Sequence, residues 1–268
     1  MSNETSARNP MTEGRQYHLM TTQGEIAPHC LVVGDPGRAQ MIAETYFTDS
    51  KKMADYRGYR TFTGTHEGVP MSVVTHGIGG ASAGTVFPEM VACGARRLIR
   101  VGSCSTLLPN VPLGDSAIVT GAVRLEGASQ CWAMPEYPAV PQWRVVQALT
   151  EAAKMLDFPF HEGIEATTDC FREGQGRANV EGWLPSHMRQ RHNDLMRMGV
   201  LCYSMEAATL FTWALTHPQE WGQVWAGAIN AIYGNRFDDT FQKGAGQDSA
   251  VRIALAAMVL LNESYPIG

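Results

Sequence analysis

Short apolar runs alternate along the chain with longer segments in which apolar residues recur at helical spacing. The apolar runs predict buried strands, because a strand covered on both faces reads as a continuous hydrophobic stretch. We expect strands at 30–33, 98–101, 115–120, 164–168, 200–203 and 225–232, and a hairpin formed by 60–65 and 71–75. Helical spacing predicts helices that start just after residue 37 and at 205, and helices over 83–93, 142–156, 179–199 and 247–261.

This alternation of strands and helices is typical of a mainly parallel α/β sheet. A chain of 268 residues fits one large domain of this class, and it contains no internal repeats, low-complexity segments or linkers. We therefore expect a single domain over residues 17–268. Residues 1–16 are polar, and we expect them to form a flexible N-terminal tail.

Composition and charge narrow the classes of partner. Hydrophobic residues make up 44% of the chain, which is enough for a sizeable core. The net charge is −5 and no lysine- or arginine-rich run occurs, so we expect neither nucleic-acid nor membrane binding. The longest apolar run, 254–261, is too short to span a bilayer, and the N-terminus carries no signal pattern.

The six cysteines include no CxxC pair, and most have apolar neighbours. This usage predicts reduced structural thiols in a cytoplasmic protein. Cys104 lies in a turn where it could be exposed, but the sequence shows no base to activate it. His187 and His192 are five residues apart, off one helical face, and no HExxH motif occurs, so we predict no metal site.

Arg100 is an anomaly, because it lies inside an apolar run that otherwise predicts a buried strand. One interpretation is a structural arginine paired within the core. The other is a ligand-binding arginine at the carboxyl end of a strand, where open α/β sheets bind ligands. Gly102 and Ser103 follow directly, and a guanidinium beside a backbone N–H and a hydroxyl suits phosphate. The local sequence leaves both interpretations open.

Two glycine-containing turns follow other predicted strands. In Gly34-Asp35-Pro36-Gly37-Arg38 the proline ends a strand and a helix starts at once, which places Arg38 at a helix N-terminus suited to an anion. The second turn, at 76–82, resembles a dinucleotide fingerprint but has Ser82 in place of the third glycine. The next predicted strand also ends in arginine and glycine rather than the acid that would bind a ribose. We therefore do not expect a nicotinamide cofactor.

Three further segments carry candidate chemistry. Phe171 can stack on a flat ring while Gln175 and Arg177 read its polar edge, although a solvated loop with a buried Phe anchor has the same composition. Ser204 is a good helix N-cap, and Glu206 in the following first turn is by default a carboxylate that satisfies the helix dipole. The long segment 233–246 contains three glycines and Arg236 and is a candidate lid.

Taken together, these motifs resemble the nucleoside phosphorylase-I family, and within it the uridine phosphorylase branch. The resemblance covers roughly residues 17–262. It rests on the following segments in this order: 34–38, 77–82, 100–103, 123–129, 137–140, Phe171 with 175–177, and Met205-Glu206. The Phe171…Gln175-x-Arg177 pattern resembles the uracil-reading motif of the uridine branch, which purine enzymes of the family lack.

The resemblance implies a fold and a set of roles. The fold is a single domain whose mixed, mostly parallel sheet forms a distorted barrel flanked by helices. The implied phosphate-binding residues are Gly34, Arg38, Arg57, Arg100 and Ser103. The implied base-binding residues are Phe171, Gln175 and Arg177, and the implied ribose-binding residues are His18, Met205 and Glu206. The implied catalytic residues among these are Arg100, Gln175, Arg177 and Glu206.

The resemblance also implies a reaction and an assembly. The reaction is phosphorolysis of uridine to uracil and ribose 1-phosphate in pyrimidine salvage, with inorganic phosphate as co-substrate and no cofactor. Arg57 and His18 match residues that the family donates from a neighbouring subunit, which implies a homo-oligomer, a hexamer built as a trimer of dimers. Two alternatives stay open: a phosphorylase for another nucleoside, such as a purine, thymidine or a modified uridine, and a catalytically weakened nucleoside-binding homologue.

The chain departs from the uridine branch at three positions. The acid that usually stands two residues before the ribose-binding glutamate is Ser204 here, and an arginine near the base is replaced by Ile232. We expect these changes to be linked, since losing both ends of a buried charge pair costs less than losing one. Arg236 is a candidate substitute from the predicted lid. Gly58 replaces a glutamate that helps bind a monovalent cation, so we do not expect that ion site.

Overall fold

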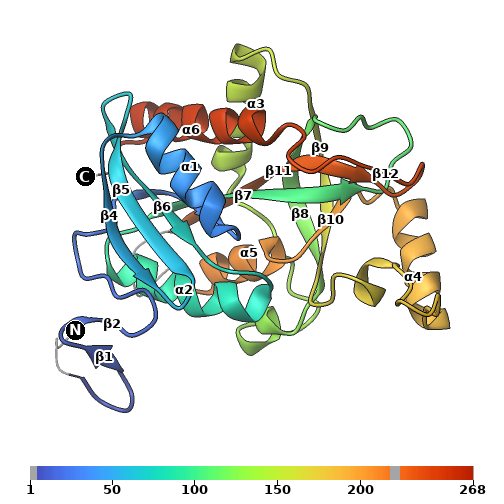
Figure 1. Ribbon diagram of the computed structural model, residues 1–268, viewed down its shortest axis with the longest axis horizontal. Coiled ribbons are helices and arrows are strands. Elements are labelled where there is room, and N and C mark those ends of the chain that lie inside the picture. Colours follow the sequence, from blue (N-terminus) through green and yellow to red (C-terminus); the bar gives the residue numbers. More distant parts are fainter. Residues whose placement is uncertain (1–4, 218–223, 268) are drawn as a thin grey trace.

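The computed structural model describes residues 5–217 and 224–267, which form a mixed sheet with helices on both sides (Figure 1). The strands are β1 Met11–Thr12, β2 Arg15–Gln16, β3 His29–Val33, β4 Thr48–Tyr56, β5 Tyr59–His66, β6 Val69–Thr75, β7 Arg97–Thr106, β8 Ser116–Leu125, β9 Phe160–Thr168, β10 Cys202–Ser204, β11 Trp225–Asn235 and β12 Thr240–Phe241. The α-helices are α1 Pro36–Tyr46, α2 Gly80–Ala92, α3 Trp143–Met155, α4 Ser186–Arg197, α5 Ala207–Thr216 and α6 Gln247–Ser264. Two short 3-10 helices are η1 Ala128–Cys131 and η2 Glu173–Gln175.

Part of the sheet closes on itself. Its strand order is β12-β11-β8-β9-β10-β7-β3-β6-β5-β4, and an additional pairing joins β11 to β7. The strands β7, β11, β8, β9 and β10 therefore form a closed ring, with β3 to β6 continuing outward from β7. Parallel pairs β3–β7, β7–β11 and β8–β9 meet antiparallel pairs β8–β11 and β7–β10. This is the mixed, barrel-like α/β domain that the resemblance implies.

The two faces of the sheet pack against separate sets of helices, as Figure 1 shows. Leu31 and Val33 of β3 join the core under α1, α3 and α6, while Cys30 and Val32 join the core over α2 and α5. Because alternate side chains of β3 enter opposite cores, the strand needs a continuous apolar run. Both cores hold the ring in place, which fixes the side chains that project from its strands.

Several element predictions are wrong in detail. β4 lies in the polar stretch that gave no strand signal, because it is an exposed edge strand without a core-facing row. The helix expected at 179–199 spans only Ser186–Arg197, after Pro185. Residues 11–12 and 15–16 pair as β1 and β2 within the segment that we expect to be a flexible N-terminal tail. Ser204 is the last residue of β10, and the N-cap of α5 is Glu206.

Candidate active site

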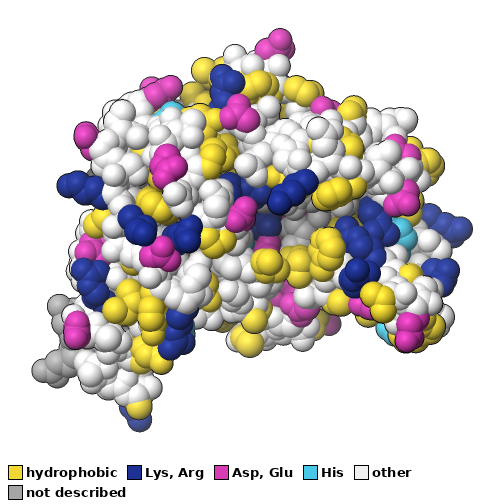
Figure 2. Space-filling view, viewed as in Figure 1, with side chains coloured by type: hydrophobic (Ala, Val, Ile, Leu, Met, Phe, Trp, Pro, Cys, Tyr) yellow, Lys and Arg dark blue, Asp and Glu magenta, His cyan; other side chains and the backbone are white. Residues whose placement is uncertain are grey.

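A cleft of about 650 Å³ lies beside β7, where the turns after β3 and β10 meet the loop after β9. Figure 2 shows this face hollowed near its centre, with basic and hydrophobic side chains around the hollow. The structure brings these predicted site residues together in its lining: Gly34, Arg38, Arg100, Ser103, Phe171, Gln175, Arg177, Met205 and Glu206.

Arg100 projects from β7 into the ring, where it is both paired and part of the cleft lining. Its Nη2 donates to Glu206 and its Nη1 donates to Asn230 Oδ1 at 2.6 Å. A side chain at Gly102 would collide with this guanidinium, since a Cβ there would lie 2.1 Å from Nη1. Burial by itself lowers the pKa of Arg100, but the charges of Glu206 and Glu165 outweigh burial and raise it, so the group stays charged.

Glu206 is buried, and although it is the N-cap residue of α5, its side chain makes no capping hydrogen bond to that helix. Its carboxylate accepts a hydrogen bond at 2.7 Å from the backbone N–H of Gly79, the N-cap residue of α2, in addition to the bond from Arg100. Burial alone would raise the pKa of Glu206, but Arg100, His76 and the Gly79 N–H together lower it. Glu206 is therefore an ionised carboxylate on the cleft wall, which is a different role from the default dipole interaction.

The turn after β3 supplies the second arginine. The Asp35 side chain caps α1 by accepting from Gly37 N at 2.8 Å, and this fixes the helix start beside the cleft. Arg38 donates from Nη1 to the Val101 carbonyl, from Nη2 to the Tyr233 hydroxyl and from Nε to Gln247. A guanidinium has five N–H donors, so these three bonds position Arg38 and leave two donors for a ligand.

The loop after β9 holds Gln175 and Arg177 in one fixed arrangement. Arg177 Nη1 donates to Gln175 Oε1 and to the Phe171 carbonyl, both at 2.6 Å, and its guanidinium lies 4.0 Å from the Phe171 ring centroid. Gln175 is buried, and its Nε2 donates to Thr168 Oγ1 at 3.1 Å. Phe171 is 57% exposed, so it is an accessible ring at the cleft and not a buried anchor.

Burial, with the charge of Arg236 as the next cause, lowers the pKa of Arg177 to about 10. Arg177 thus remains a cation at neutral pH. Arg236 follows β11 and donates from Nη2 to the Gly176 carbonyl at 3.3 Å. A second guanidinium thus contacts the loop that carries Gln175 and Arg177. It comes from position 236 and not from position 232, where the uridine branch usually has its arginine.

Two predicted site residues lie outside the cleft lining. The His18 backbone N–H and Nδ1 both contact the Glu89 carboxylate on α2. Arg57, in the turn between β4 and β5, donates to the Tyr17 hydroxyl at 3.2 Å. Tyr17 packs edge-to-face on His18, so the two predicted residues form one surface group. In the described part of the chain, neither His18 nor Arg57 lines the cleft with the other site residues.

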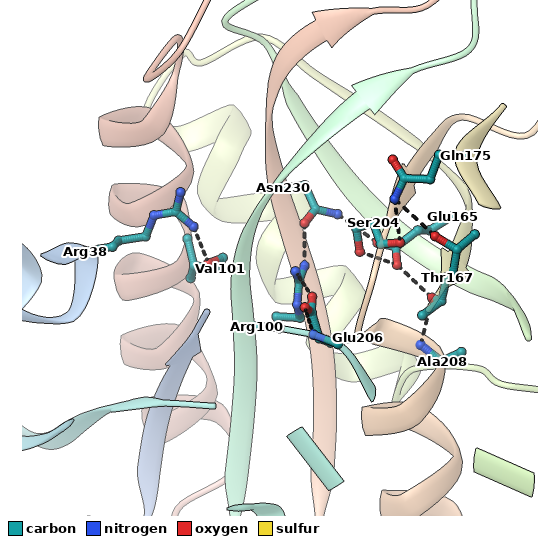
Figure 3. Close-up of polar contacts among 12 residues, drawn as sticks. Arg38, Arg100, Val101, Glu165, Thr167, Gln175, Ser204, Glu206, Ala208 and Asn230 are labelled. Atoms are coloured by element: carbon teal, nitrogen blue, oxygen red, sulfur yellow. Dashed lines mark hydrogen bonds and ion pairs between the residues drawn. The ribbon is translucent and has the colours of Figure 1, made fainter. Parts of the chain in front are cut away.

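A buried carboxylate that the sequence analysis missed lies at the centre of the ring (Figure 3). Glu165 of β9 is fully buried and accepts hydrogen bonds from Thr167 Oγ1 at 2.8 Å, from Asn230 Nδ2 at 2.9 Å and from Ser204 Oγ. β9 also carries His161, Glu162 and two threonines, so Glu165 did not stand out in its strand as Arg100 did in an apolar run. Phe241 and Lys243 also line the cleft from the predicted lid segment and were not singled out.

Two positions that depart from the uridine branch have different surroundings. Ser204 contacts Glu165, so a buried acid does lie beside this position. Ile232 packs among Cys104, Cys202 and other apolar side chains. Cys104 is 5% exposed, which corrects the expectation that the turn could expose it.

Residues 5–217 and 224–267 contain no cluster of three His, Cys, Asp or Glu side chains arranged for a metal ion. Within the same residues no helix has both the length and the apolar character that a membrane crossing requires.

The fold and the cleft define a class of protein. The fold presents two arginines, Arg38 and Arg100, an ionised glutamate and a glutamine–arginine pair to one cavity of the size usual for small-molecule sites. A model of the phosphorylase superfamily matches residues 28–217, and the chain belongs to this family.

Several curated relatives are named for the nucleoside on which they act. A uridine phosphorylase of Thermococcus kodakarensis is 41% identical over 259 residues, which cover 96% of this chain and 91% of that protein. The uridine phosphorylase of Escherichia coli is 34% identical over 222 residues, covering 82% and 87%. A guanosine phosphorylase of Halorubrum lacusprofundi is 30% identical over 259 residues, covering 92% and 99%. These similarities confirm the predicted family resemblance.

Proposed function

We propose that this protein is a pentosyltransferase that cleaves uridine with inorganic phosphate, releasing uracil and ribose 1-phosphate. The observation that carries the proposal is the Gln175–Arg177 pair beside the exposed Phe171 ring. The relatives at 41% and 34% identity, both named uridine phosphorylase, support it.

The polar edge of the pair complements uracil. Because Gln175 Nε2 is engaged by Thr168, the amide presents Oε1 as an acceptor, and Arg177 stands beside it as a donor. Uracil offers an N3–H donor next to a carbonyl acceptor, which matches this order. Cytosine has an acceptor at N3 and a donor beside it, so a bound cytosine would leave buried polar groups unpaired. We therefore expect strong preference for uridine over cytidine.

Phosphate binds between Arg100 and Arg38, where Gly34 and Ser103 bring the backbone and a hydroxyl to the same part of the cleft. Glu206 and Met205 face the ribose from the start of α5, and the Glu206 carboxylate accepts from the ribose diol. Since Arg100 and Glu206 contact each other directly, phosphate and sugar are held next to one another. This proximity suits attack of a phosphate oxygen on C1′.

Cleavage of the C1′–N bond passes through an oxocarbenium-like sugar, as in glycoside hydrolysis. The C1′–O bond to phosphate forms on one face while the bond to the base breaks and its electron pair moves onto uracil. Arg177 donates to the carbonyl oxygen on which this negative charge develops. No covalent enzyme nucleophile is required, and we propose that the reaction uses no metal or cofactor.

We further propose that the cleft is completed in an assembly of copies of this chain. Arg57 and His18, which lie together on the surface, would then reach the phosphate and the ribose 5′-hydroxyl of a neighbouring cleft. The family resemblance implies a hexamer built from three dimers, the cysteine usage predicts a cytoplasmic location, and both are part of this proposal.

The test is a substrate panel of uridine, thymidine, cytidine and guanosine, each with and without phosphate. Guanosine is the second candidate substrate, favoured by the guanosine phosphorylase relative and by the N1–H and carbonyl edge of guanine. Fast phosphate-dependent release of uracil supports the proposal. Faster release of guanine replaces it with the second candidate, and nucleoside binding without turnover in calorimetry contradicts any phosphorylase.

Arg177→Ala is expected to lower kcat/KM for uridine by about 100- to 1,000-fold, since it removes a donor to the developing charge. The matched control is Arg172→Ala on the same loop, because the Arg172 side chain is exposed and, among the described residues, donates only to the Ala178 carbonyl. Equal losses in both variants would contradict the role of Arg177.

A further inference from the structure

Glu165 is a fully buried carboxylate to which the reaction above gives no part. It projects from β9 into the closed ring and is surrounded by hydrogen-bond donors from three strands: Thr167 on β9 itself, Ser204 on β10 and Asn230 on β11. A buried carboxyl group is costly unless its oxygens are well bonded, and here both oxygens of Glu165 accept hydrogen bonds.

One oxygen of Glu165 controls the side chain that holds Arg100. Glu165 Oε2 accepts from Asn230 Nδ2 at 2.9 Å, and Asn230 Oδ1 accepts from Arg100 Nη1 at 2.6 Å (Figure 3). A carboxylate only accepts hydrogen bonds, so it fixes which end of the Asn230 amide faces it. The opposite amide orientation would turn an NH2 group against the guanidinium.

The other oxygen of Glu165 reaches the opposite half of the cleft. Oε1 accepts from Ser204 Oγ and from Thr167 Oγ1, and Thr167 Oγ1 in turn accepts from Ala208 N in the first turn of α5. The Ser204 carbonyl accepts from Gln175 Nε2 at 3.4 Å. One buried carboxylate thus bridges β9, β10 and β11.

We propose that Glu165 is a positioning residue for phosphate: by orienting Asn230 it holds Arg100 in the geometry that binds the anion. The inference rests on the phosphorolysis proposed above and deepens it. Phosphate would bind Arg100 while the ribose diol binds Glu206, its ion-pair partner. During this binding the bond from Arg100 Nη1 to Asn230 keeps the guanidinium in place. The uridine branch usually has an acid at position 204. Here Glu165 on the neighbouring strand β9 supplies that acid.

The charge of Glu165 opposes anion binding, so removing the charge and removing the orientation have opposite effects on phosphate affinity. Glu165→Asp separates them, because it keeps the charge and withdraws the carboxylate from Asn230 by one methylene. We expect the KM for phosphate and the calorimetric Kd for inorganic phosphate to rise about 10- to 100-fold, the loss typical of a hydrogen bond to a charged group. Glu126→Asp is the matched control, since Glu126 is also buried and bonds Ser129 N instead of Asn230.

A double-mutant cycle with Asn230→Ala tests whether Glu165 acts through Asn230. Asn230→Ala alone should raise the same two constants by a similar factor, because it removes the bond to Arg100. In that background Glu165→Asp should add less than about 2-fold, since coupled residues are non-additive. Circular dichroism and thermal melts accompany each variant, and Asn230→Ala carries the test by itself if Glu165→Asp does not fold.

Each outcome is decisive. Unchanged phosphate constants in folded Glu165→Asp or Asn230→Ala overturn the positioning role, as do multiplicative effects in the double variant. Equal rises in Glu126→Asp would show a general effect of disturbing the core and would also overturn it. Should the wild type lack phosphate-dependent turnover, the proposed function fails. The calorimetric Kd values for inorganic phosphate still decide on Glu165.

Discussion

At the scale of single residues, Arg100 explains why position 102 carries no side chain. The guanidinium passes directly over Gly102 to reach Asn230, and a Cβ there would lie 2.1 Å from Arg100 Nη1 and 2.2 Å from Asn230 Oδ1. Arginine, glycine and asparagine are therefore one unit, although they stand on two strands.

Gly102→Ala is expected to displace the Arg100 guanidinium and to lower phosphate-dependent kcat/KM by about 100-fold, comparable to losing a positioned donor. The fold should persist, because the atoms it collides with are side-chain ends. Gly121→Ala on β8 of the same ring is the control, since the nearest atom to its Cβ would be 3.8 Å away. Initial rates at varied phosphate measure both, and similar rates for the two variants would contradict the unit.

His76 is a second residue whose burial has a measurable consequence. Burial lowers the pKa of His76 to about 4, against the opposing charge of Glu206. Between its ordinary pKa of 6.5 and about 4, the unfolded chain binds a proton at this position that the folded chain does not. The contribution of neutral His76 to the free energy of unfolding is therefore fully present above pH 6.5 and is lost as the pH falls toward 4.

We expect His76→Gln to reduce the slope of unfolding free energy against pH between 6.5 and 4, because glutamine does not titrate. Urea unfolding at half-unit pH steps, with wild type and variant side by side, gives the two slopes. Above pH 7 the difference in unfolding free energy between them should be constant. Identical slopes below pH 6.5 would mean that His76 is protonated in the folded protein.

At the scale of elements, sequence patterns identify the strands that are buried on both faces and miss the strands that are exposed. β3 and β7 are predictable because alternate side chains enter two cores. β4 is not, because an exposed edge strand has no apolar row. The loop carrying Gln175 and Arg177 is predictable only as a motif, since its conformation depends on contacts with Thr168 and Ser105 on other segments.

Position 165 on β9 and position 204 on β10 are neighbours, and of the two only Glu165 is an acid. A second carboxylate at 204 would face Glu165, and two like charges in a buried site cannot both ionise cheaply. Ser204→Glu is expected to lower the unfolding free energy by about 3 kcal/mol at neutral pH. The loss should shrink as the pH falls, because one protonated carboxyl can donate to the other.

Ser204→Gln introduces a side chain of about the size of glutamate but without its charge. It is therefore the control for steric effects in urea unfolding. Combining Ser204→Glu with Glu165→Ser returns the site to one acid and should recover most of the stability. If the double substitution is as unstable as Ser204→Glu alone, the two positions are not interchangeable carriers of the acid.

At the scale of the whole molecule, ring closure brings together residues that no sequence window contains. β11 pairs with β7 although more than a hundred residues separate them, and this pairing places Asn230 beside Gly102. Arg100 and Glu206 were predictable by resemblance to a family. The Glu165–Asn230 connection was not, because neither residue belongs to a recognisable motif and their contact exists only across the closed ring.

The molecule also leaves Arg57 and His18 outside the cleft that their predicted roles require. If they serve a neighbouring subunit, a chain with Arg57→Ala and a chain with Glu206→Ala should complement each other. In a mixed dimer, the cleft with intact Glu206 receives an intact Arg57 from its partner, and the other cleft has lost both. Random mixing at equal amounts makes half the dimers mixed with one good cleft each, so about a quarter of wild-type activity is expected.

Each variant assayed alone gives the baseline, and the mixture is prepared by co-expression in equal amounts and purified through one tag that both chains carry. Sedimentation confirms that the mixed species is an oligomer. If Arg57 acted on the cleft of its own chain, every cleft in the mixture would lack one residue and activity would stay at the baseline. Recovery would place the surface group of Tyr17, His18 and Arg57 at a subunit boundary, where a residue remote from its own cleft contributes to its neighbour's.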